Sequence, residues 1–163
     1  MPTPFVNNLS DNTRKEMIGL LNERLADAID LTLGIKQAHW NLKGQSFIGI
    51  PELLDAVADR MRDNADLLAE RCVILGGLAQ GTSQTVAGAS SLDAYPAEAQ
   101  NQRHHVAALT ERFMAFGASL RENIEAAGEA GDADTEDLFT EISRIVDKDA
   151  WFIGAHNESG DDA

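Results

Sequence analysis

Apolar residues recur at alternating intervals of three and four along much of the chain, which is the spacing of one face of an α-helix. Thr13 and Glu16 have the spacing of a capping box at the start of the first such stretch. We therefore expect a first helix from Thr13 to Trp40, about 42 Å long. Its predicted buried stripe consists of Ile18, Leu21, Leu25, Ala28, Thr32, Ile35 and His39.

A second helix is predicted from Pro51 to Leu75, where Gly76 and Gly77 stop it. The stretch that follows, GGLAQGTSQTVAGASS, is rich in Gly, Ser and Thr, which indicates a connection with a short helical piece near Val86 to Leu92. The roughly 19 residues between Gly76 and Pro96 can span about 60 Å when extended. The chain can therefore cross the full length of a helix at this point.

Two more helices complete the pattern. The third is predicted to begin with Pro96 in its first turn and to end at Gly128, and the fourth to follow Gly131 with Asp132 or Asp134 as its cap. The expected buried faces comprise Val106, Leu109, Phe113, Phe116, Leu120 and Ala127 in the third helix, and Leu138, Ile142, Ile145 and Phe152 in the fourth.

The helices and the loop lengths between them predict an all-α fold. Short loops after the first and third helices favour antiparallel neighbours, whereas the long connection between the second and third permits a crossover. This order is the ferritin-like four-helix bundle, and it fits the loop lengths better than a simple up-and-down bundle. We expect one domain at residues 13–154, an N-terminal tail at 1–12 and an acidic C-terminal tail at 155–163.

Composition then limits the class of function. The chain of 163 residues carries a formal charge of −14, which repels phosphate backbones and disfavours a generic nucleic-acid binder, although a small local patch escapes that argument. Cations are the favoured partners. The single cysteine, Cys72, cannot form an internal disulfide and is expected to be buried. No signal-peptide pattern is present and no apolar run approaches the roughly 20 residues that span a bilayer, so we expect a cytoplasmic protein without membrane contact.

The second helix holds the residues with the clearest chemistry. Asp55, Asp66 and Glu70 fall on one helical face, and their oxygens are hard ligands that suit iron, manganese or magnesium. Asp55 and Asp66 are about 16 Å apart along the axis and cannot hold one ion within a chain. If the helix packs antiparallel against its copy near Met61 and Arg62, Asp55 of one subunit meets Asp66 and Glu70 of the other. Two identical intersubunit sites would result.

Other interpretations of these residues stay open. The three acids could instead form a solvated helix face, with ion-pair partners in Arg60, Arg62 and Arg71. His39 closes the stripe of the first helix, where it suits either a nitrogen ligand beside carboxylates or a hydrogen-bonded core residue. The pair His104 and His105 lies among Gln and Arg residues and resembles a polar helix surface.

Several ordered motifs resemble the Dps family, the DNA-binding proteins from starved cells. They are KQAHWNLKG at 36–44 with Phe47, LGGLAQGT at 75–82, DTEDLF at 134–139 and DKDAWFI at 147–153, together with Asp55, Asp66 and the Ala-Glu-Arg of 69–71. The resemblance covers most of the chain, from near residue 10 to near residue 155. It implies a hollow homo-dodecamer whose ferroxidase centres lie between two-fold-related subunits, oxidise Fe(II), usually with hydrogen peroxide, and feed an internal ferric mineral.

The resemblance also implies residue roles. The metal ligands would be His39 and Asp55 of one subunit with Asp66 and Glu70 of its partner. Trp40 would be a catalytic aromatic beside the centre that scavenges oxidising equivalents, and no organic cofactor is expected.

One position departs from the family pattern. Pro51 stands where the family usually has a second histidine, and proline cannot bind a metal. The neighbouring Glu52 points about 100° away, which makes it a poor substitute. We therefore expect a slower or lower-affinity ferroxidase, with water as one candidate for the position that the second histidine leaves vacant.

A second acidic region lies near the predicted start of the fourth helix. Eight acids and no Lys or Arg occur from Glu122 to Glu141. Asp134 and Asp137 are similar in position to the carboxylates that line three-fold pores in ferritin-like cages, where negative charge concentrates Fe(II). The alternative is a solvated loop and helix N-terminus.

These observations favour an iron-oxidising and iron-storing protein whose partners are Fe(II), hydrogen peroxide or oxygen, and further copies of itself. One alternative is a nucleoid protein that protects DNA by binding it, which the sparse basic residues near the N-terminus (Arg14 and Lys15) and the acidic final GDDA disfavour. Another alternative is a structural cage whose altered centre binds zinc or little metal.

Overall fold

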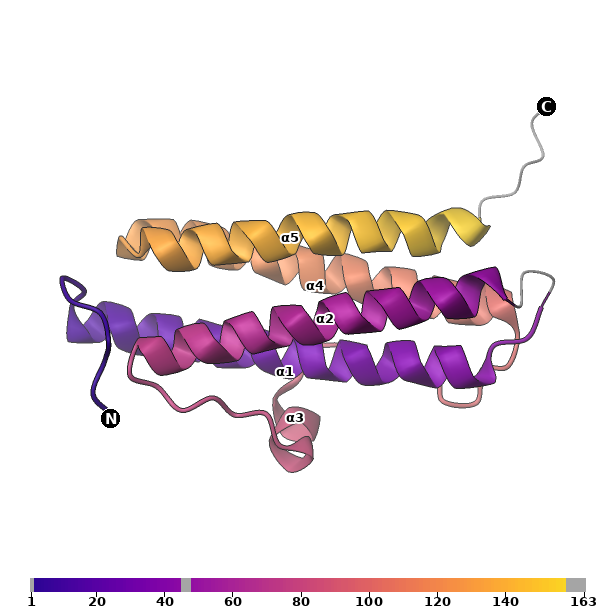
Figure 1. Cartoon of the computed structure of the whole chain (residues 1–163), viewed down its shortest axis with the longest axis horizontal. Coiled ribbons are helices and arrows are strands. Elements are labelled where there is room, and N and C mark those ends of the chain that lie inside the picture. Colours follow the sequence, from indigo (N-terminus) through magenta and orange to yellow (C-terminus); the bar gives the residue numbers. More distant parts are fainter. Residues whose placement is uncertain (1, 45–47, 158–163) are drawn as a thin grey trace.

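The computed structural model describes residues 2–44 and 48–157, which fold into a bundle of helices. The helices are α1 (Asp11–Asn41), α2 (Gly49–Ile74), α3 (Ser83–Ala89), α4 (Gln102–Ala130), α5 (Ala133–Gly154) and the short 3-10 helix η1 (Ala155–Asn157). α1 pairs with α2 and α4 pairs with α5, and the two pairs stack as layers (Figure 1). The predicted all-α, ferritin-like four-helix bundle is confirmed.

The connection between α2 and α4 crosses the length of the bundle. α2 and α4 run in the same direction, and α3 lies within the connection and packs against α1 (Figure 1). The buried carboxylate of Asp27 in α1 holds the segment by accepting the backbone N–H of Ser91 at 2.7 Å. The long crossover is thus confirmed, with its short helix at Ser83–Ala89 rather than at Val86–Leu92.

Side-chain caps fix where the helices of the bundle begin. The cap of α1 is Ser10, whose hydroxyl oxygen accepts the backbone N–H of Thr13 at 3.1 Å, so the helix starts at Asp11 and not at Thr13. At the start of α5 the Asp132 carboxylate accepts the backbone N–H of Thr135 at 3.1 Å. Of the two caps considered for this helix, Asp132 is the one used.

The start of α4 differs most from the sequence prediction. The residues after Pro96 form a turn in which Ala99 donates its backbone N–H to the Pro96 carbonyl at 2.9 Å. The helix begins only at Gln102, because the Asn101 side chain accepts the backbone N–H of His104 at 3.0 Å. Proline in a first turn permits a helix without satisfying any donor, whereas an Asn cap satisfies one. The predicted start at Pro96 is therefore wrong.

Apolar side chains from all four long helices fill the interior. Every residue predicted for the face of the third helix is buried, as is Cys72. The predicted face of α5 is mostly wrong, because Leu138, Ile145 and Phe152 are only partly buried. The buried apolar residues of α5 are Phe139, Ile142, Val146 and Ile153. The same stripe contains Asp149, a buried carboxylate paired with Arg60 of α2 at 2.6 Å. Because a charged residue stands in the stripe, the apolar spacing in the sequence did not reveal it.

Both predicted tails are described in part. Phe5 donates its backbone N–H to the carbonyl of Ile74 at 2.9 Å, so this N-terminal segment lies against the end of α2. Residues 155–157 continue α5 as η1, whereas 158–163 of the C-terminal tail, like Phe47 of the family motif, lie outside the described residues. None of the described helices combines the length and the apolar character needed to cross a membrane.

Candidate metal centre

His39 and Asp55 meet where the last turn of α1 lies beside the start of α2, and we call them the first half-site. The Nδ1 atom of His39 lies 3.0 Å from the Pro51 carbonyl oxygen and 3.4 Å from Asp55 Oδ1. A carbonyl oxygen only accepts, so Nδ1 carries the hydrogen. With the hydrogen on Nδ1, Nε2 is the nitrogen left to bind a metal, which is the usual arrangement of a metal-binding histidine.

A lysine holds the carboxylate of the first half-site. Lys36 Nζ lies 2.6 Å from Asp55 Oδ1, and this hydrogen bond lowers the pKa of Asp55 below its usual value, with a smaller lowering from His39 against the opposing effect of burial. Asp55 is therefore an anion at neutral pH. The same ammonium lies 5.7 Å from the ring centre of Trp40, whose side chain is 69% exposed. The Lys36 ammonium, the His39 imidazole and the Trp40 indole thus lie close together near the end of α1.

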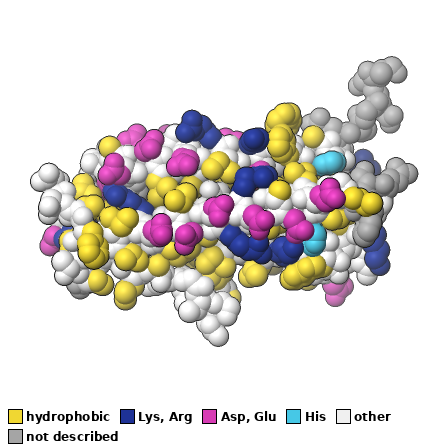
Figure 2. Space-filling view, in the orientation of Figure 1, with side chains coloured by type: hydrophobic (Ala, Val, Ile, Leu, Met, Phe, Trp, Pro, Cys, Tyr) yellow, Lys and Arg dark blue, Asp and Glu magenta, His cyan; other side chains and the backbone are white. Residues whose placement is uncertain are grey.

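Asp66 and Glu70 form the second half-site, farther along α2. Both side chains are exposed, and Figure 2 shows acidic side chains in a row over α2. Among the described residues neither carboxylate makes an ion pair. The three arginines of α2 pair with other acids, namely Arg60 with Asp149, Arg62 with Asp59 and Arg71 with Asp132. The alternative of a helix face on which these arginines pair with Asp55, Asp66 and Glu70 is therefore not what the structure shows.

One chain does not assemble a complete metal site in the part that the structure describes. No three His, Cys, Asp or Glu side chains there come close enough to hold a metal ion. The two half-sites lie about 16 Å apart along α2, because Asp55 and Asp66 are separated by three turns. The structure brings His39 to Asp55 but leaves Asp66 and Glu70 apart from them, as the sequence spacing predicted.

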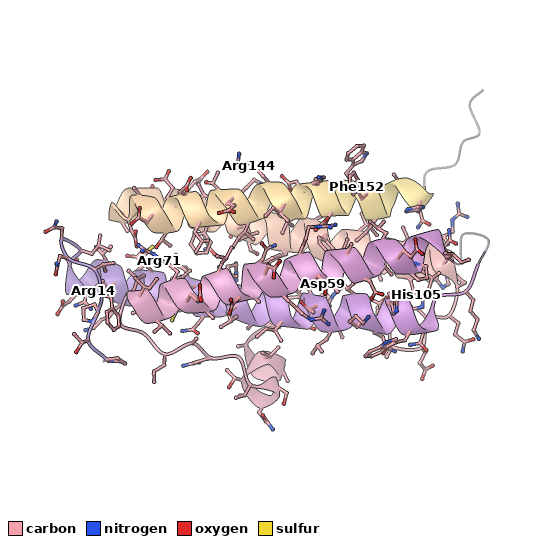
Figure 3. All side chains as sticks on the ribbon, in the orientation of Figure 1. Arg14, Asp59, Arg71, His105, Arg144 and Phe152 are labelled. Carbon is pink, nitrogen blue, oxygen red and sulfur yellow. The ribbon has the colours of Figure 1, made fainter. Side chains whose placement is uncertain are left out.

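The two acids considered for a pore lie close to the second half-site. Asp134 and Asp137, in the first turns of α5, are exposed and line one groove together with Glu70 and Glu141. Arg71 borders the groove, where it pairs with the buried Asp132 at 2.7 Å and lies 3.8 Å from Asp134 (Figure 3). The sequence held no signal for this neighbourhood, because it depends on the register between α2 and α5.

One histidine was misjudged from the sequence. His105 is fully buried, not part of a polar surface, and its Nδ1 lies 2.6 Å from the Tyr95 hydroxyl oxygen. The spacing of His105, Leu109, Arg112 and Phe116 continues the apolar stripe of α4, and that period was the available signal.

Comparison with known proteins agrees with the fold and with the ordered motifs. Residues 18–162 match the family model described as a ferritin-like domain. A DNA protection during starvation protein from Agrobacterium fabrum is 45% identical over 150 residues, covering 92% of this chain and 93% of that protein. One from Mycolicibacterium smegmatis is 32% identical over 151 residues, covering 93% and 82%.

Solved structures give the same result. A tetragonal form of Mycobacterium smegmatis Dps superposes with a TM-score of 0.92 at 31% identity, covering 98% of this chain and 96% of that chain. A Dps protein from Streptomyces coelicolor reaches a TM-score of 0.92 at 34% identity, covering 99% and 96%. By its family match, its relatives and its fold, this chain belongs to the ferritin-like family and, within it, to the DNA protection during starvation (Dps) proteins.

Proposed function

We propose that this protein oxidises Fe(II), with hydrogen peroxide as the preferred oxidant over oxygen, and stores the ferric product inside a cage built from its own copies. The observation that carries the proposal is the state of the two half-sites. His39 directs its Nδ1–H at the Pro51 carbonyl, and the ionised Asp55 lies 3.4 Å from the same nitrogen, which leaves Nε2 without a hydrogen-bond partner among the described residues. Asp66 and Glu70 stand exposed on the same helix without ion-pair partners among the described residues.

The half-sites become complete centres when two chains pack with their α2 helices antiparallel. His39 and Asp55 of one chain then face Asp66 and Glu70 of the other, twice per dimer. An apolar groove between α1 and α2 supports this pairing, because its lining includes Leu25, Ile29, Leu33 and Ala65 directly beside Asp66. Leu33 is 58% exposed in the single chain, and burial in a dimer removes it from water. Six such dimers make the proposed dodecamer.

The ligand set suits iron as a substrate. One imidazole and three carboxylates provide the nitrogen and hard oxygen donors that Fe(II) accepts. Two Fe(II) ions give one electron each to hydrogen peroxide, which is reduced to water without release of a hydroxyl radical. Lys36 occupies the cation position beside Asp55, so iron must displace its ammonium from that carboxylate. The exposed indole of Trp40 is placed to intercept an oxidising equivalent that escapes the centre.

The acidic groove supplies a route to the centre. Asp134 and Asp137 would attract Fe(II) at an entrance in the cage, and Glu70 lines the same groove. The attraction is electrostatic, so it weakens as ionic strength rises.

Stopped-flow oxidation of Fe(II) on assembly verified by size tests the proposal. We expect faster oxidation with peroxide than with oxygen, and loss of most of that rate in Asp66→Asn. The matched control is Asp63→Asn, which removes the same charge from an exposed position of the same helix. Absence of oxidation with both oxidants contradicts the proposal, and metal analysis of the purified protein then shows whether zinc fills the centre.

A second candidate function is DNA protection by direct binding, which the names of the relatives favour. The formal charge of −14 opposes it. A mobility-shift assay at low and at moderate salt separates the two functions: retention of the DNA complex at moderate salt supports binding, and its absence leaves iron and peroxide consumption as the protective activity.

A further inference from the structure

Tyr95 and His105 form a hydrogen-bonded pair that the proposed iron centre does not use. Tyr95 lies in the segment between α3 and α4 and is partly buried, and its hydroxyl oxygen is 2.6 Å from His105 Nδ1. His105 is fully buried, and Figure 3 shows it at the end of the bundle where α1 ends and α2 begins. Tyr95 is the only tyrosine in the sequence.

The protonation states of the pair are defined by burial. Burial lowers the pKa of His105, with a smaller raising effect from the Ala99 backbone and a lowering effect from His104. Burial also raises the pKa of Tyr95 to about 12. At neutral pH the imidazole is therefore neutral and the phenol keeps its proton. In the tautomer that carries its hydrogen on Nε2, which has no hydrogen-bond partner among the described residues, the phenol O–H donates to Nδ1 and the imidazole is ready to accept that proton.

A positive charge beside the ring opposes loss of an electron alone. The Arg112 guanidinium lies 5.8 Å from the centre of the Tyr95 ring, and it donates a hydrogen bond to the Asp93 carbonyl that fixes it there. A radical cation on this ring would be repelled by the guanidinium. Electron loss from Tyr95 is favourable only if the phenol proton leaves at the same time, and His105 Nδ1 stands in position to receive it.

The Tyr95 ring packs against α1, the helix that carries the indole of the candidate centre. The Tyr95 ring packs against Gly34 of α1, where an added Cβ would lie 3.2 Å from ring atom Cδ2. Trp40 is six residues farther, about 9 Å along the axis. The Lys36 ammonium over the Trp40 indole disfavours positive charge on that ring, so an electron moves downhill from Tyr95 to an oxidised Trp40.

We propose that Tyr95 and His105 are a redox pair that drains oxidising equivalents from Trp40. The oxidised indole, a radical cation, takes one electron from Tyr95 and returns to neutral tryptophan. The phenol O–H bond breaks, its proton passes to His105 Nδ1, and a neutral tyrosyl radical and an imidazolium remain. One further Fe(II) reduces the tyrosyl radical, and the proton returns to the phenolate oxygen. The source of the oxidised indole rests on the proposed function.

Pulse radiolysis of the iron-free assembly tests the pair without iron chemistry. Azide radicals oxidise exposed tryptophan, and we expect the indole radical to decay as a tyrosyl radical grows, at a rate that is lower in D₂O. His105→Gln should slow this transfer by at least about tenfold, because the side chain keeps a polar group but cannot accept the proton. The matched control is His104→Gln, which changes the exposed neighbour and should leave the rate unchanged.

Variants of the two tryptophans test the donor. Trp40→Phe should remove most of the transfer, whereas Trp151→Phe, which alters an indole 66% exposed on α5, should keep it. Decay of the indole radical without a tyrosyl radical in the unmodified protein would overturn the proposal. If His105→Gln does not fold, the rate in D₂O decides, because an unchanged rate excludes coupled proton loss.

Freeze-quench EPR after Fe(II) and peroxide separates this inference from the proposed function. A tyrosyl signal that disappears in Tyr95→Phe, with ferroxidase rate retained, supports both. Transfer in the radiolysis experiment together with absent Fe(II) oxidation supports the redox pair and rejects the ferroxidase. Normal Fe(II) oxidation without tyrosyl growth in the radiolysis experiment rejects the redox pair alone.

Discussion

Among single side chains, Pro51 has two effects on the candidate centre. The resemblance implies a histidine ligand where its ring stands, and its carbonyl accepts the Nδ1–H of His39 at 3.0 Å and so orients that imidazole. Proline costs α2 little, because it is the third residue of the helix, where backbone N–H groups have no partner within the helix. That a ligand is missing at this position stays a prediction from the sequence, which held no sign that the same residue contacts His39.

Restoring a histidine at this position should strengthen the centre. Pro51→His adds a nitrogen ligand and keeps the carbonyl, so we expect Fe(II) affinity or the peroxide-dependent rate to rise by about tenfold. Stopped-flow oxidation and equilibrium Fe(II) binding measure the change. The matched control is Glu52→His, one residue farther and exposed, which should have little effect. An unchanged rate and affinity in a folded Pro51→His variant would count against a weakened site.

Among the helices, existence and order followed from the apolar period, whereas ends and faces followed only in part. The third-helix face was predicted because its apolar spacing runs without a break from Val106 to Leu120. The α5 face was missed because the charged Asp149 stands among its apolar residues. The start of α4 was missed because the Asn101 side chain caps the helix, whereas Pro96 satisfies no backbone donor. A buried ion pair or a competing cap depends on the neighbouring helix, which the local pattern does not contain.

The turn that ends α2 depends on a residue without a side chain. A Cβ on Gly77 would lie 2.7 Å from Sγ of the buried Cys72 and 2.8 Å from Cγ2 of Ile18, which is partly buried against the core. Gly77→Ala should therefore lower the free energy of unfolding by about 1–3 kcal/mol. The matched control is Gly88→Ala in α3, where nothing lies within 4 Å of the added atom. Thermal unfolding of both variants measures the difference, and equal melting temperatures would refute the close packing at Gly77.

At the scale of the whole molecule, acidic residues from distant parts of the sequence gather in one groove. The fold places Asp134 and Asp137 in one groove with Glu70, so two acidic regions far apart in the sequence become neighbours. Sequence spacing predicted that Asp55 and Asp66 of one chain cannot share an ion, because three helical turns separate them. It did not predict the shared groove, since the register of α2 against α5 is set by long-range contacts such as that of Arg71 with Asp132.

Neutralising the groove should slow iron uptake without altering the centre. We expect Asp134→Asn together with Asp137→Asn to reduce the rate of mineral formation several-fold at low ionic strength, and less at high ionic strength, because attraction of Fe(II) is screened by salt. The control pair Glu98→Gln and Glu111→Gln removes the same charge near the start of α4. Equal uptake rates in both double variants would exclude the groove as the route.

The ion pair of Lys36 with Asp55 has a consequence for how the protein is made. In small zinc domains the metal is part of the folding reaction, and the apo chain is unfolded. Here the chain carries its own counter-charge, 2.6 Å from the carboxylate, and keeps that ligand ionised and fixed in place. If Asp55 binds iron as proposed, this ion pair predicts that the chain can fold and assemble without an iron supply. Under the proposed function, the cage could then be made before iron and oxidative stress are present.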